Sequence, residues 1–223
     1  MNHRFATSRA AALNFTAVAA LAVFASACSA TSLPDPALDL PLASSAGSQT
    51  AVLSGGCFWG VEGVFEHVKG VTSVVAGYAG GKADSASYEQ VSSGRTGHAE
   101  SVRITYDPSR IRYGQLLKVF LSVAHDPTEL NRQGPDSGTQ YRSAIFYSSQ
   151  DQKRVADAYL AQLQAARVFP HPIVTQVAPL PGFYDAEAYH QHYLEHHPEQ
   201  PYIVINDLPK IVNLRRQFPD LYR

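Results

Sequence analysis

Strand-like and helix-like segments alternate along residues 51–178, and this alternation constrains the fold more than any other feature of the sequence. Apolar residues between positions 57 and 68 recur every three or four residues, which predicts one buried face of a helix. In contrast, Val102, Ile104 and Tyr106 alternate with polar residues, which predicts a strand over 100–106. Similar patterns predict strands at 51–54, 71–78, 143–148 and 173–178, and helices at 113–124 and 151–167.

The order of these segments, β-α-β-β-α-β followed by α-β, predicts an α/β (α+β) fold with helices packed on one sheet. We expect its core to be a ferredoxin-like split βαβ sandwich. Residues 80–99 and 125–142 contain several glycines and are expected to form long decorating loops, where functional sites are commonly found.

The N-terminal segment has the pattern of a secretory signal peptide over residues 1–27. Arg4 and Arg9 precede an apolar run at 10–27, which ends in an Ala-Ser-Ala sequence that a signal peptidase accepts. Cys28 follows directly, and the segment resembles a bacterial lipobox, although Ala25 stands where that pattern prefers leucine. We therefore expect export to the bacterial periplasm or envelope. Cys28 is either lipidated, which would anchor the chain to a membrane, or unmodified.

The remaining chain divides into three expected parts. Residues 28–50 contain three prolines and many small polar residues without a regular period, which predicts a flexible tether. A folded domain is expected over 51–210, followed by a C-terminal tail at 211–223.

The 18 Lys and Arg residues balance 19 Asp and Glu residues, so no basic excess indicates a nucleic-acid partner. The two cysteines are too few for a disulfide framework or a zinc ribbon.

Cys57 is the first candidate for chemistry. It follows a strand and two glycines and begins a helix, where free N–H groups and the helix dipole favour a thiolate. This context predicts a nucleophile, although a buried structural cysteine is the alternative. Phe58 and Trp59 follow directly and would form an apolar pocket wall or part of the core.

A histidine-rich segment at 185–199 is the second candidate. His192 and His196 are four residues apart, a spacing that can hold a metal on one helix face. The segment has no HExxH pattern and no cysteine, and we expect no metal there. His98 and His125 are expected to be ordinary hydrogen-bonding histidines.

Several spaced motifs, covering residues 50–205, resemble the peptide methionine sulfoxide reductases of the A type, the peptide-methionine (S)-S-oxide reductases. The first is Gly-Cys-Phe-Trp-Gly at 56–60, followed by Gly-Tyr-Ala-Gly-Gly at 77–81 and Tyr-Glu-Gln-Val at 88–91. Thr-Gly-His-Ala-Glu at 96–100 and His-Asp-Pro-Thr at 125–128 come next, before the segments 131–134 and 136–143.

The resemblance implies a role for each matching residue. Cys57 would attack the sulfoxide sulfur and become a sulfenic acid, while Glu100 would protonate the departing oxygen. Such a donor must be a carboxyl group kept neutral by apolar surroundings. The other implied site residues are Tyr88 and Tyr141, which would hold the oxygen; Asp136, which would support the site; Phe58 and Trp59, which would hold the substrate methyl group; and the wall candidates Tyr184, Tyr189 and Tyr193.

Recycling of Cys57 needs a reductant that this chain does not supply after that residue, because no further cysteine follows it. We expect no bound cofactor and an external thiol or thioredoxin-like donor. A flexible tether would also let an unlipidated Cys28 reach Cys57. The expected substrates are methionine sulfoxide and oxidised proteins, and the expected role is protein repair. Two alternatives are a cysteine hydrolase or acyltransferase with His98 or His125 as base, and a non-catalytic binding module.

Overall fold

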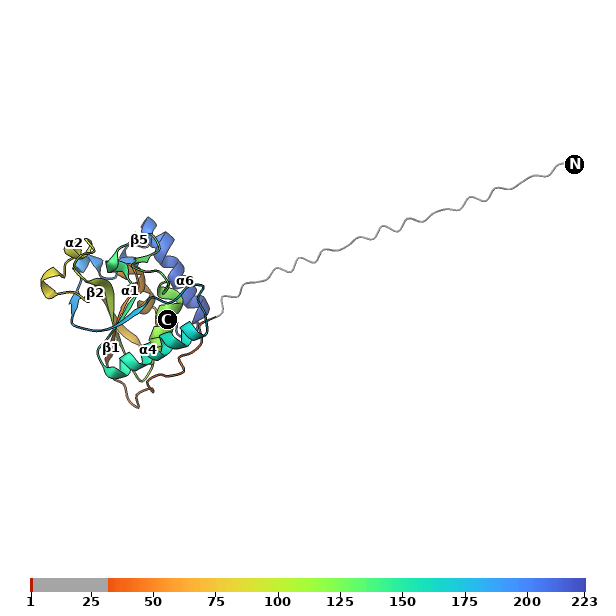
Figure 1. Ribbon diagram of the computed structural model, residues 1–223, viewed down its shortest axis with the longest axis horizontal. Coiled ribbons are helices and arrows are strands. Elements are labelled where there is room, and N and C mark those ends of the chain that lie inside the picture. Colours follow the sequence, from red (N-terminus) through yellow and green to blue (C-terminus); the bar gives the residue numbers. More distant parts are fainter. Residues whose placement is uncertain (2–31) are drawn as a thin grey trace. The chain divides into compact units, whose positions relative to one another are not determined.

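A six-stranded sheet forms the centre of the molecule in the computed structural model, which describes Met1 and residues 32–223 (Figure 1). Its strands are β1 (Gln49–Ser54), β2 (Val71–Ala79), β3 (Ala99–Tyr106), β6 (Ala144–Tyr147), β7 (Gln176–Pro179) and β8 (Phe183–Asp185). Their order across the sheet is β7-β6-β1-β3-β2-β8. Only β6 and β7 pair in parallel, and all other neighbours are antiparallel.

The four inner strands confirm the predicted split βαβ core. Helix α1 (Phe58–Glu66) connects β1 to β2, and β3 lies between these two strands. Helix α3 (Tyr113–Val119) connects β3 towards β6, and here β1 lies between. This interleaving is the ferredoxin-like arrangement expected from the element order. Helix α4 (Gln150–Ala165) then leads to β7, while β8 extends the opposite edge.

The helices pack through the apolar faces that the sequence pattern predicts. On α1, Val61, Val64 and Phe65 are at most 1% exposed. The same holds for Leu116 of α3 and Leu163 of α4, which are fully buried. The remaining helices are α2 (Tyr88–Val91), α5 (Tyr193–His196) and α6 (Leu208–Gln217), and π-helical turns cover Phe120–Ala124 and Ile203–Asp207.

Two predicted elements differ in the structure. The strand expected at 173–178 begins only at Gln176, because the N–H of Val174 donates to Pro127 O rather than to the sheet. The histidine-rich segment is not one helix: His192 has a left-handed backbone (φ +53°), which separates a 3-10 turn at Ala188–His190 from α5. His192 caps α5, and the N–H of His196 donates to His192 O at 3.0 Å, so these two residues are still one helical turn apart, with ring centroids at 6.1 Å.

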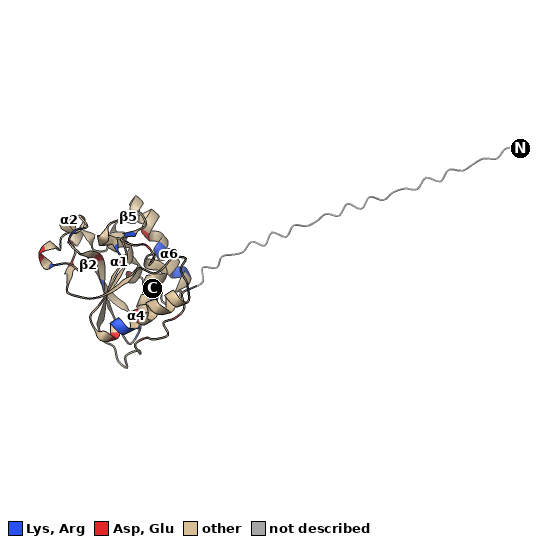
Figure 2. Ribbon diagram, in the orientation of Figure 1, with Lys and Arg blue, Asp and Glu red and all other residues tan. Residues whose placement is uncertain are grey.

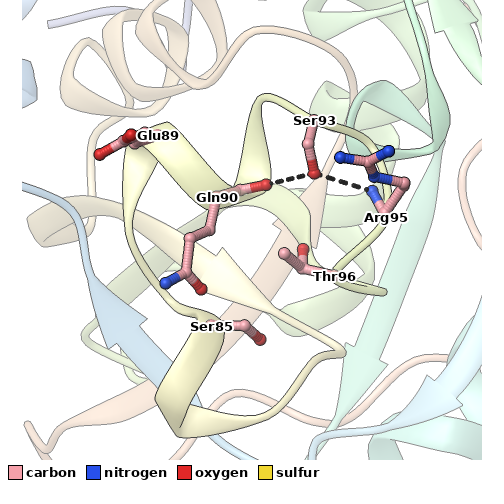
Figure 3. A pocket seen from close by; sticks show the side chains of 6 residues that line it. All are labelled: Ser85, Glu89, Gln90, Ser93, Arg95 and Thr96. Atoms are coloured by element: carbon pink, nitrogen blue, oxygen red, sulfur yellow. Dashed lines mark hydrogen bonds between the residues drawn. The ribbon is translucent and has the colours of Figure 1, made fainter.

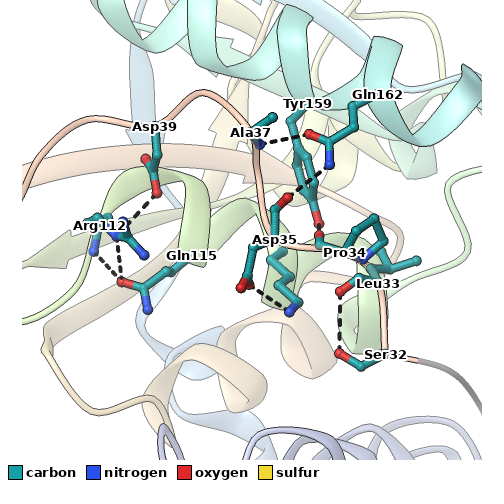
Figure 4. A network of polar contacts seen from close by, with 11 residues as sticks. Ser32, Leu33, Pro34, Asp35, Ala37, Asp39, Arg112, Gln115, Tyr159 and Gln162 are labelled. Carbon is teal, nitrogen blue, oxygen red and sulfur yellow. Dashed lines mark hydrogen bonds and ion pairs between the residues drawn. The ribbon is translucent and has the colours of Figure 1, made fainter. Parts of the chain in front are cut away.

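Residues 32–48 form a strap along the domain instead of the predicted flexible tether (Figure 4). Leu33 inserts its side chain into the core and is only 9% exposed. The hydroxyl of Tyr159 in α4 donates to Pro34 O at 2.9 Å, which fixes the chain beside that helix.

The strap stays attached along its length. The carboxylate of Asp39 accepts a hydrogen bond from the N–H of Gly114 at 2.7 Å, and the N–H of Ala43 donates to Pro108 O at 2.9 Å. These bonds, to side-chain and to backbone atoms, have no sequence period, which is why composition suggested a free linker. Residues 32–48 do not supply the free length on which a reach from Cys28 to Cys57 depended.

The C-terminal residues also belong to the domain rather than to a separate tail. Leu214 is fully buried, and Phe218 is 8% exposed. Tyr222 forms a β-bridge with Val68 at the end of α1. The folded domain thus begins with the strap at Ser32 and continues to the C-terminal residues. The predicted signal peptide and Cys28 lie outside residues 32–223.

Figure 2 shows positively and negatively charged residues at positions interspersed over the domain, and the full chain has a net charge of −1. Within the described part of the chain, no helix combines the length and apolar character needed to cross a membrane.

Candidate active site

A cavity of about 200 Å³ lies where β1 ends and α1 begins. Side chains from the core sheet and from both long loops meet there. Its lining residues are Cys57, Phe58, Trp59, Tyr88, Glu100, Asp136, Tyr141 and Tyr202. The structure therefore brings together seven of the ten residues predicted for the site, and it adds Tyr202.

Cys57 caps the N-terminus of α1, as the sequence predicts. Gly56 has φ +89°, and a Cβ there would lie 2.5 Å from the Gln133 side chain, so this sharp turn requires glycine. The thiol is 9% exposed. Burial, followed by the negative charges of Glu100 and Asp207, raises the pKa of Cys57 well above its ordinary value.

This pKa shift is opposite in direction to the one expected from the helix N-terminus. The hydrogen bond from the Trp59 backbone and the charge of Lys210 do favour the thiolate, but burial outweighs them. The resting site therefore holds a protonated thiol. The thiolate must form as the substrate reacts.

Glu100 lies on β3 with its carboxyl group directed at the start of α1. Its Oε2 accepts a hydrogen bond from the N–H of Phe58 at 3.0 Å, and the residue is 3% exposed. Burial raises the pKa of Glu100 to about 8, against the opposing effect of the Phe58 bond, and the nearby Asp136 raises it further. At neutral pH this group is a carboxylic acid, which can donate a proton.

Aromatic rings form the opposite wall. Trp59 stacks on Tyr193 with ring centroids 3.7 Å apart, and its Nε1–H donates to Nδ1 of His190 at 3.1 Å. Burial lowers the pKa of His190, so the ring is neutral and Nδ1 can accept this bond. Phe58 packs 4.9 Å from the same ring. His190 thereby positions Phe58 and Trp59, the two aromatic residues on this side of the cavity.

The polar side of the cavity contains three tyrosines and one carboxylate. The Tyr202 hydroxyl donates to Oδ2 of Asp136, which links the C-terminal region to the hairpin formed by β4 (Arg132–Gln133) and β5 (Asp136–Ser137). Burial raises the pKa of Tyr141, and Glu100 adds to this effect, so its hydroxyl stays protonated. Tyr88 at the start of α2 is held through its N–H, which donates to Glu187 Oε1 at 2.9 Å.

Arg142 joins the two loops that flank the cavity. Its guanidinium donates to Thr139 O at 2.8 Å and to His98 O at 3.1 Å through Nη1, and to Gly97 O at 2.9 Å through Nη2. The bonded carbonyls of Gly97 and His98 lie just before Glu100 in the sequence, and Arg142 directly follows Tyr141. The three bonds therefore fix the separation between Glu100 and Tyr141.

The sequence analysis missed three residues near the thiol: Tyr202, Asp207 and Lys210. Asp207 is fully buried, and its Oδ1 pairs with Lys210 Nζ at 3.0 Å. A Cβ on Gly60 would lie 2.0 Å from this carboxylate, so the close approach of α1 depends on glycine. The only local signal for these residues is the Pro209 that marks a helix start, and it does not indicate packing against Cys57.

Two predicted wall residues do not line the cavity. Tyr184 on β8 contacts His98 edge-on, with centroids 5.6 Å apart. Tyr189 is 60% exposed and packs on the outer side of His190, at 4.1 Å. The third wall candidate, Tyr193, is also absent from the lining, but it supports the wall by stacking on Trp59.

The hydrolase alternative lacks a general base. Nδ1 of His98 accepts from the N–H of Gly81, and its Nε2 bonds Lys82 O at 2.9 Å. Both ring nitrogens of His125 are likewise engaged, with Phe120 O and with Ser143 Oγ. Burial lowers the pKa of His125 to about 4. Neither histidine has a ring nitrogen free to activate Cys57.

A second, open pocket of about 590 Å³ lies beside α2 (Figure 3). It is lined by Ser85, Glu89, Gln90, Ser93, Arg95 and Thr96. Ser93 Oγ donates to Gln90 O and accepts from the N–H of Arg95, so the Ser93 hydroxyl is already paired within the pocket wall. This pocket contains no thiol and is separate from the cavity at Cys57.

The fold and the site together define a cysteine-dependent α/β enzyme. Its thiol faces a neutral carboxylic acid in a cavity with one aromatic side and one hydroxyl-bearing side. Such a cavity fits a small group that is apolar at one end and polar at the other.

Comparison with known proteins identifies the family. The family model described as peptide methionine sulfoxide reductase matches residues 49–221. The chain is 61% identical over 176 residues to a peptide methionine sulfoxide reductase MsrA 2 of Mesorhizobium japonicum, covering 79% of this chain and 90% of that protein. It is 50% identical over 173 residues to MsrA of Chromobacterium violaceum, covering 78% and 98%.

Solved structures agree with this result. Mxr1 of Saccharomyces cerevisiae in reduced form matches with a TM-score of 0.63 and 34% identity, covering 69% of this chain and 87% of that one. Methionine sulfoxide reductase A of Corynebacterium diphtheriae matches with a TM-score of 0.60 and 36% identity, covering 69% and 77%. The chain belongs to the peptide methionine sulfoxide reductase family. It is an oxidoreductase that reduces methionine sulfoxide to methionine and so repairs oxidised proteins.

Proposed function

We propose that Cys57 accepts the oxygen atom of a methionine-S-sulfoxide, free or within a protein, while Glu100 supplies the proton that the oxygen needs. The observation that carries this proposal is the buried, neutral carboxyl group of Glu100, held by Phe58 next to Cys57. Tyr88 and Tyr141 would bind the oxygen, and Phe58 and Trp59 would contact the methyl group; all four residues line the cavity.

The reaction balances without a bound cofactor. The Cys57 sulfur bonds to the sulfoxide sulfur while the proton from Glu100 is added to the oxygen. The oxygen then leaves the substrate sulfur as hydroxide and attacks the Cys57 sulfur, which breaks the new S–S bond. The products are the thioether and Cys57 sulfenic acid, so the substrate sulfur is reduced and the cysteine sulfur is oxidised by two electrons. The thiol proton replaces the one that Glu100 donated.

The two unlike sides of the cavity support stereochemical selection. The aromatic wall and the hydroxyl side would distinguish the methyl group from the oxygen, and the thiol defines a third direction of approach. We assign the S epimer because the motifs resemble the A type of the family.

Recycling is proposed to use an external thiol or a thioredoxin-like donor. Residues 32–223 contain Cys57 and no other cysteine. One thiol would displace water from the sulfenic acid to form a mixed disulfide, and a second thiol would release Cys57 as a disulfide forms. Because the Cys57 thiol lies in the cavity, the donor sulfur must enter through the substrate opening.

The N-terminal sequence supports a location for this activity. Arg4 and Arg9, the apolar run and the Ala-Ser-Ala sequence favour export to the bacterial periplasm or envelope. A lipid on Cys28 would anchor the enzyme to a membrane. Envelope proteins would then be its substrates.

A single-turnover assay tests the chemistry. Enzyme carrying Cys28→Ser is mixed with each separated epimer of methionine sulfoxide without reductant, and methionine is counted. We expect one methionine per enzyme from the S epimer, with a sulfenic acid trapped at Cys57, and none from Cys57→Ser. Glu100→Gln should slow the step by about 10²- to 10⁴-fold, as loss of a proton donor does.

Two results would contradict the proposal. Equal turnover of both epimers would remove the stereochemical assignment, and an unchanged rate in Glu100→Gln would remove the proton donor. Addition of a dithiol should restore repeated turnover in the Cys28→Ser protein. Failure to restore it would indicate that Cys28 takes part in recycling.

A further inference from the structure

Three side chains of the kinds that bind metals meet at the C-terminal end of α1, away from Cys57. Glu62 and Glu66 are four residues apart on this helix, and His192 approaches them from the segment before α5. One oxygen or nitrogen atom from each residue lies within 4.8 Å of the other two. From the sequence, His192 is paired only with His196 and no metal is expected in segment 185–199, so this group with Glu62 and Glu66 is not predicted.

Glu62 gives an independent reason to expect a cation. It is fully buried, and its Oε2 accepts the N–H of His192 at 3.0 Å. Its Oε1 is buried and has no hydrogen-bond partner among the described residues. A buried carboxylate with an unpaired oxygen is unfavourable unless a proton or a cation neutralises it. Burial and the nearby Glu66 raise the pKa of Glu62 to about 7, so proton and cation would compete near neutral pH.

The surroundings are predominantly acidic and open to solvent. His192 Nδ1 pairs with Glu66 Oε1, and the charges of Glu62 and Glu195 also act on this imidazole. A pocket of about 580 Å³ gives access, lined in part by Glu66, His192 and Glu195. The nearby cation is Arg223, whose guanidinium is engaged with Glu66 O and Val71 O, and the ring of His67 bonds Gly63 O.

We propose that Glu62, Glu66 and His192 form a binding site for a divalent transition-metal ion of the Zn²⁺ type. One imidazole and two carboxylates are a ligand set that Zn²⁺ accepts, with water or Glu195 completing the coordination. Zinc–ligand bonds of about 2.0–2.2 Å require the hydrogen bond between His192 and Glu66 to open, so that an ion can enter between these side chains and Glu62. The side chains of His192 and Glu66 are 50% and 16% exposed, so they can turn towards the buried Glu62.

A bound ion would stabilise the wall of the active site. His192 lies between His190, which accepts the Trp59 hydrogen bond, and Tyr193, which stacks on Trp59. Anchoring His192 to α1 would therefore hold both partners of Trp59 in place. This is a positioning role, and the ion would take no part in the transfer of oxygen.

Zinc titration of the full chain tests the proposal. Cys28 and Cys57 are first replaced by serine, so that no thiol can bind the metal, and ZnCl₂ is titrated by calorimetry. We expect one ion per chain and a rise in Tm with zinc. Glu66→Gln and His192→Gln should each weaken binding by about tenfold or more. His197→Gln, which removes an exposed imidazole from the same segment, should bind zinc as the parent does.

The opposite results would overturn the site. Absence of zinc binding in the serine-substituted chain would exclude it directly. Binding that survives both Glu66→Gln and His192→Gln, or is lost in His197→Gln, would indicate adventitious capture by surface histidines. Because both test substitutions are at solvent-accessible side chains, circular dichroism of each variant should match that of the parent.

Discussion

At the scale of single residues, the site is defined by two buried groups that both keep their protons. Burial raises the pKa of Cys57 well above its ordinary value and that of Glu100 to about 8. The cavity thus stores a nucleophile and an acid in neutral form until a sulfoxide binds.

Because Glu100 has a folded-state pKa above its ordinary value of 4.5, its contribution to stability is full below pH 4.5 and is lost as pH rises through about 8.

The rate of oxygen transfer should follow the protonation of Glu100. As pH rises through about 8 the carboxyl group ionises, and we expect the single-turnover rate with saturating substrate to fall. In Glu100→Gln the lower remaining rate should not show this descending limb. Quenched-flow measurements of the single-turnover rate between pH 6 and 10 give the pH profile. A wild-type rate that stays constant or rises across this range would contradict the role of Glu100.

At the scale of secondary-structure elements, the core sheet supplies the thiol and the acid, while the two long loops supply the groups that face them. Tyr88 comes from α2, Asp136 from the β4–β5 hairpin and Tyr141 from the adjoining 3-10 turn. Arg142 fastens these loops to each other through three backbone carbonyls. Its planar guanidinium can bond several carbonyls in fixed directions, whereas a lysine ammonium group is a single point.

Replacement of Arg142 by lysine should therefore damage the site while retaining the charge. We expect kcat/KM to fall by about tenfold to hundredfold, because small displacements of reacting groups have effects of this size. The free energy of unfolding should fall by about 1–3 kcal/mol, because carbonyl groups lose their donors. Steady-state kinetics and urea denaturation measure both. Arg95→Lys, at an exposed arginine on the facing loop 80–99, is the control and should change neither quantity.

At the scale of the whole molecule, segments at both ends of the described chain complete the domain. The strap lies along α3 and α4, and Leu33 joins the main core (Figure 4). At the other end, α6 and the residues after it pack beside α1, where Asp207 and Lys210 approach Cys57. The terminal segments thus contribute to stability and to the electrostatic environment of the thiol.

Leu33→Ala tests the contribution of the strap. Removal of a buried leucine side chain should lower the free energy of unfolding by about 2 kcal/mol or more. Activity per folded molecule should stay unchanged, because the strap does not line the cavity. Leu42→Ala is the matched control, since Leu42 lies on the same strap with 51% exposure. Equal stability of the two variants in denaturant would show that the strap is not an integral part of the fold.

The sequence by itself determined the core and most of the cavity. Periodic apolar residues predict the helix at Phe58 and the strand at Glu100, because burial of one face repeats with the geometry of the element. The order of such elements was sufficient to predict the split βαβ topology. The spaced motifs identified Cys57, Glu100 and Tyr141, which the structure places around one cavity.

Only the tertiary structure decided how the remaining parts pack. The strap and the C-terminal helix attach through side chain–backbone bonds and single apolar insertions, which leave no period in the sequence. For the same reason Tyr202 lies at the cavity while Tyr184 lies behind it. The pKa of Cys57 rises although it caps a helix, because desolvation depends on every atom packed around the thiol and not on its neighbours in the chain.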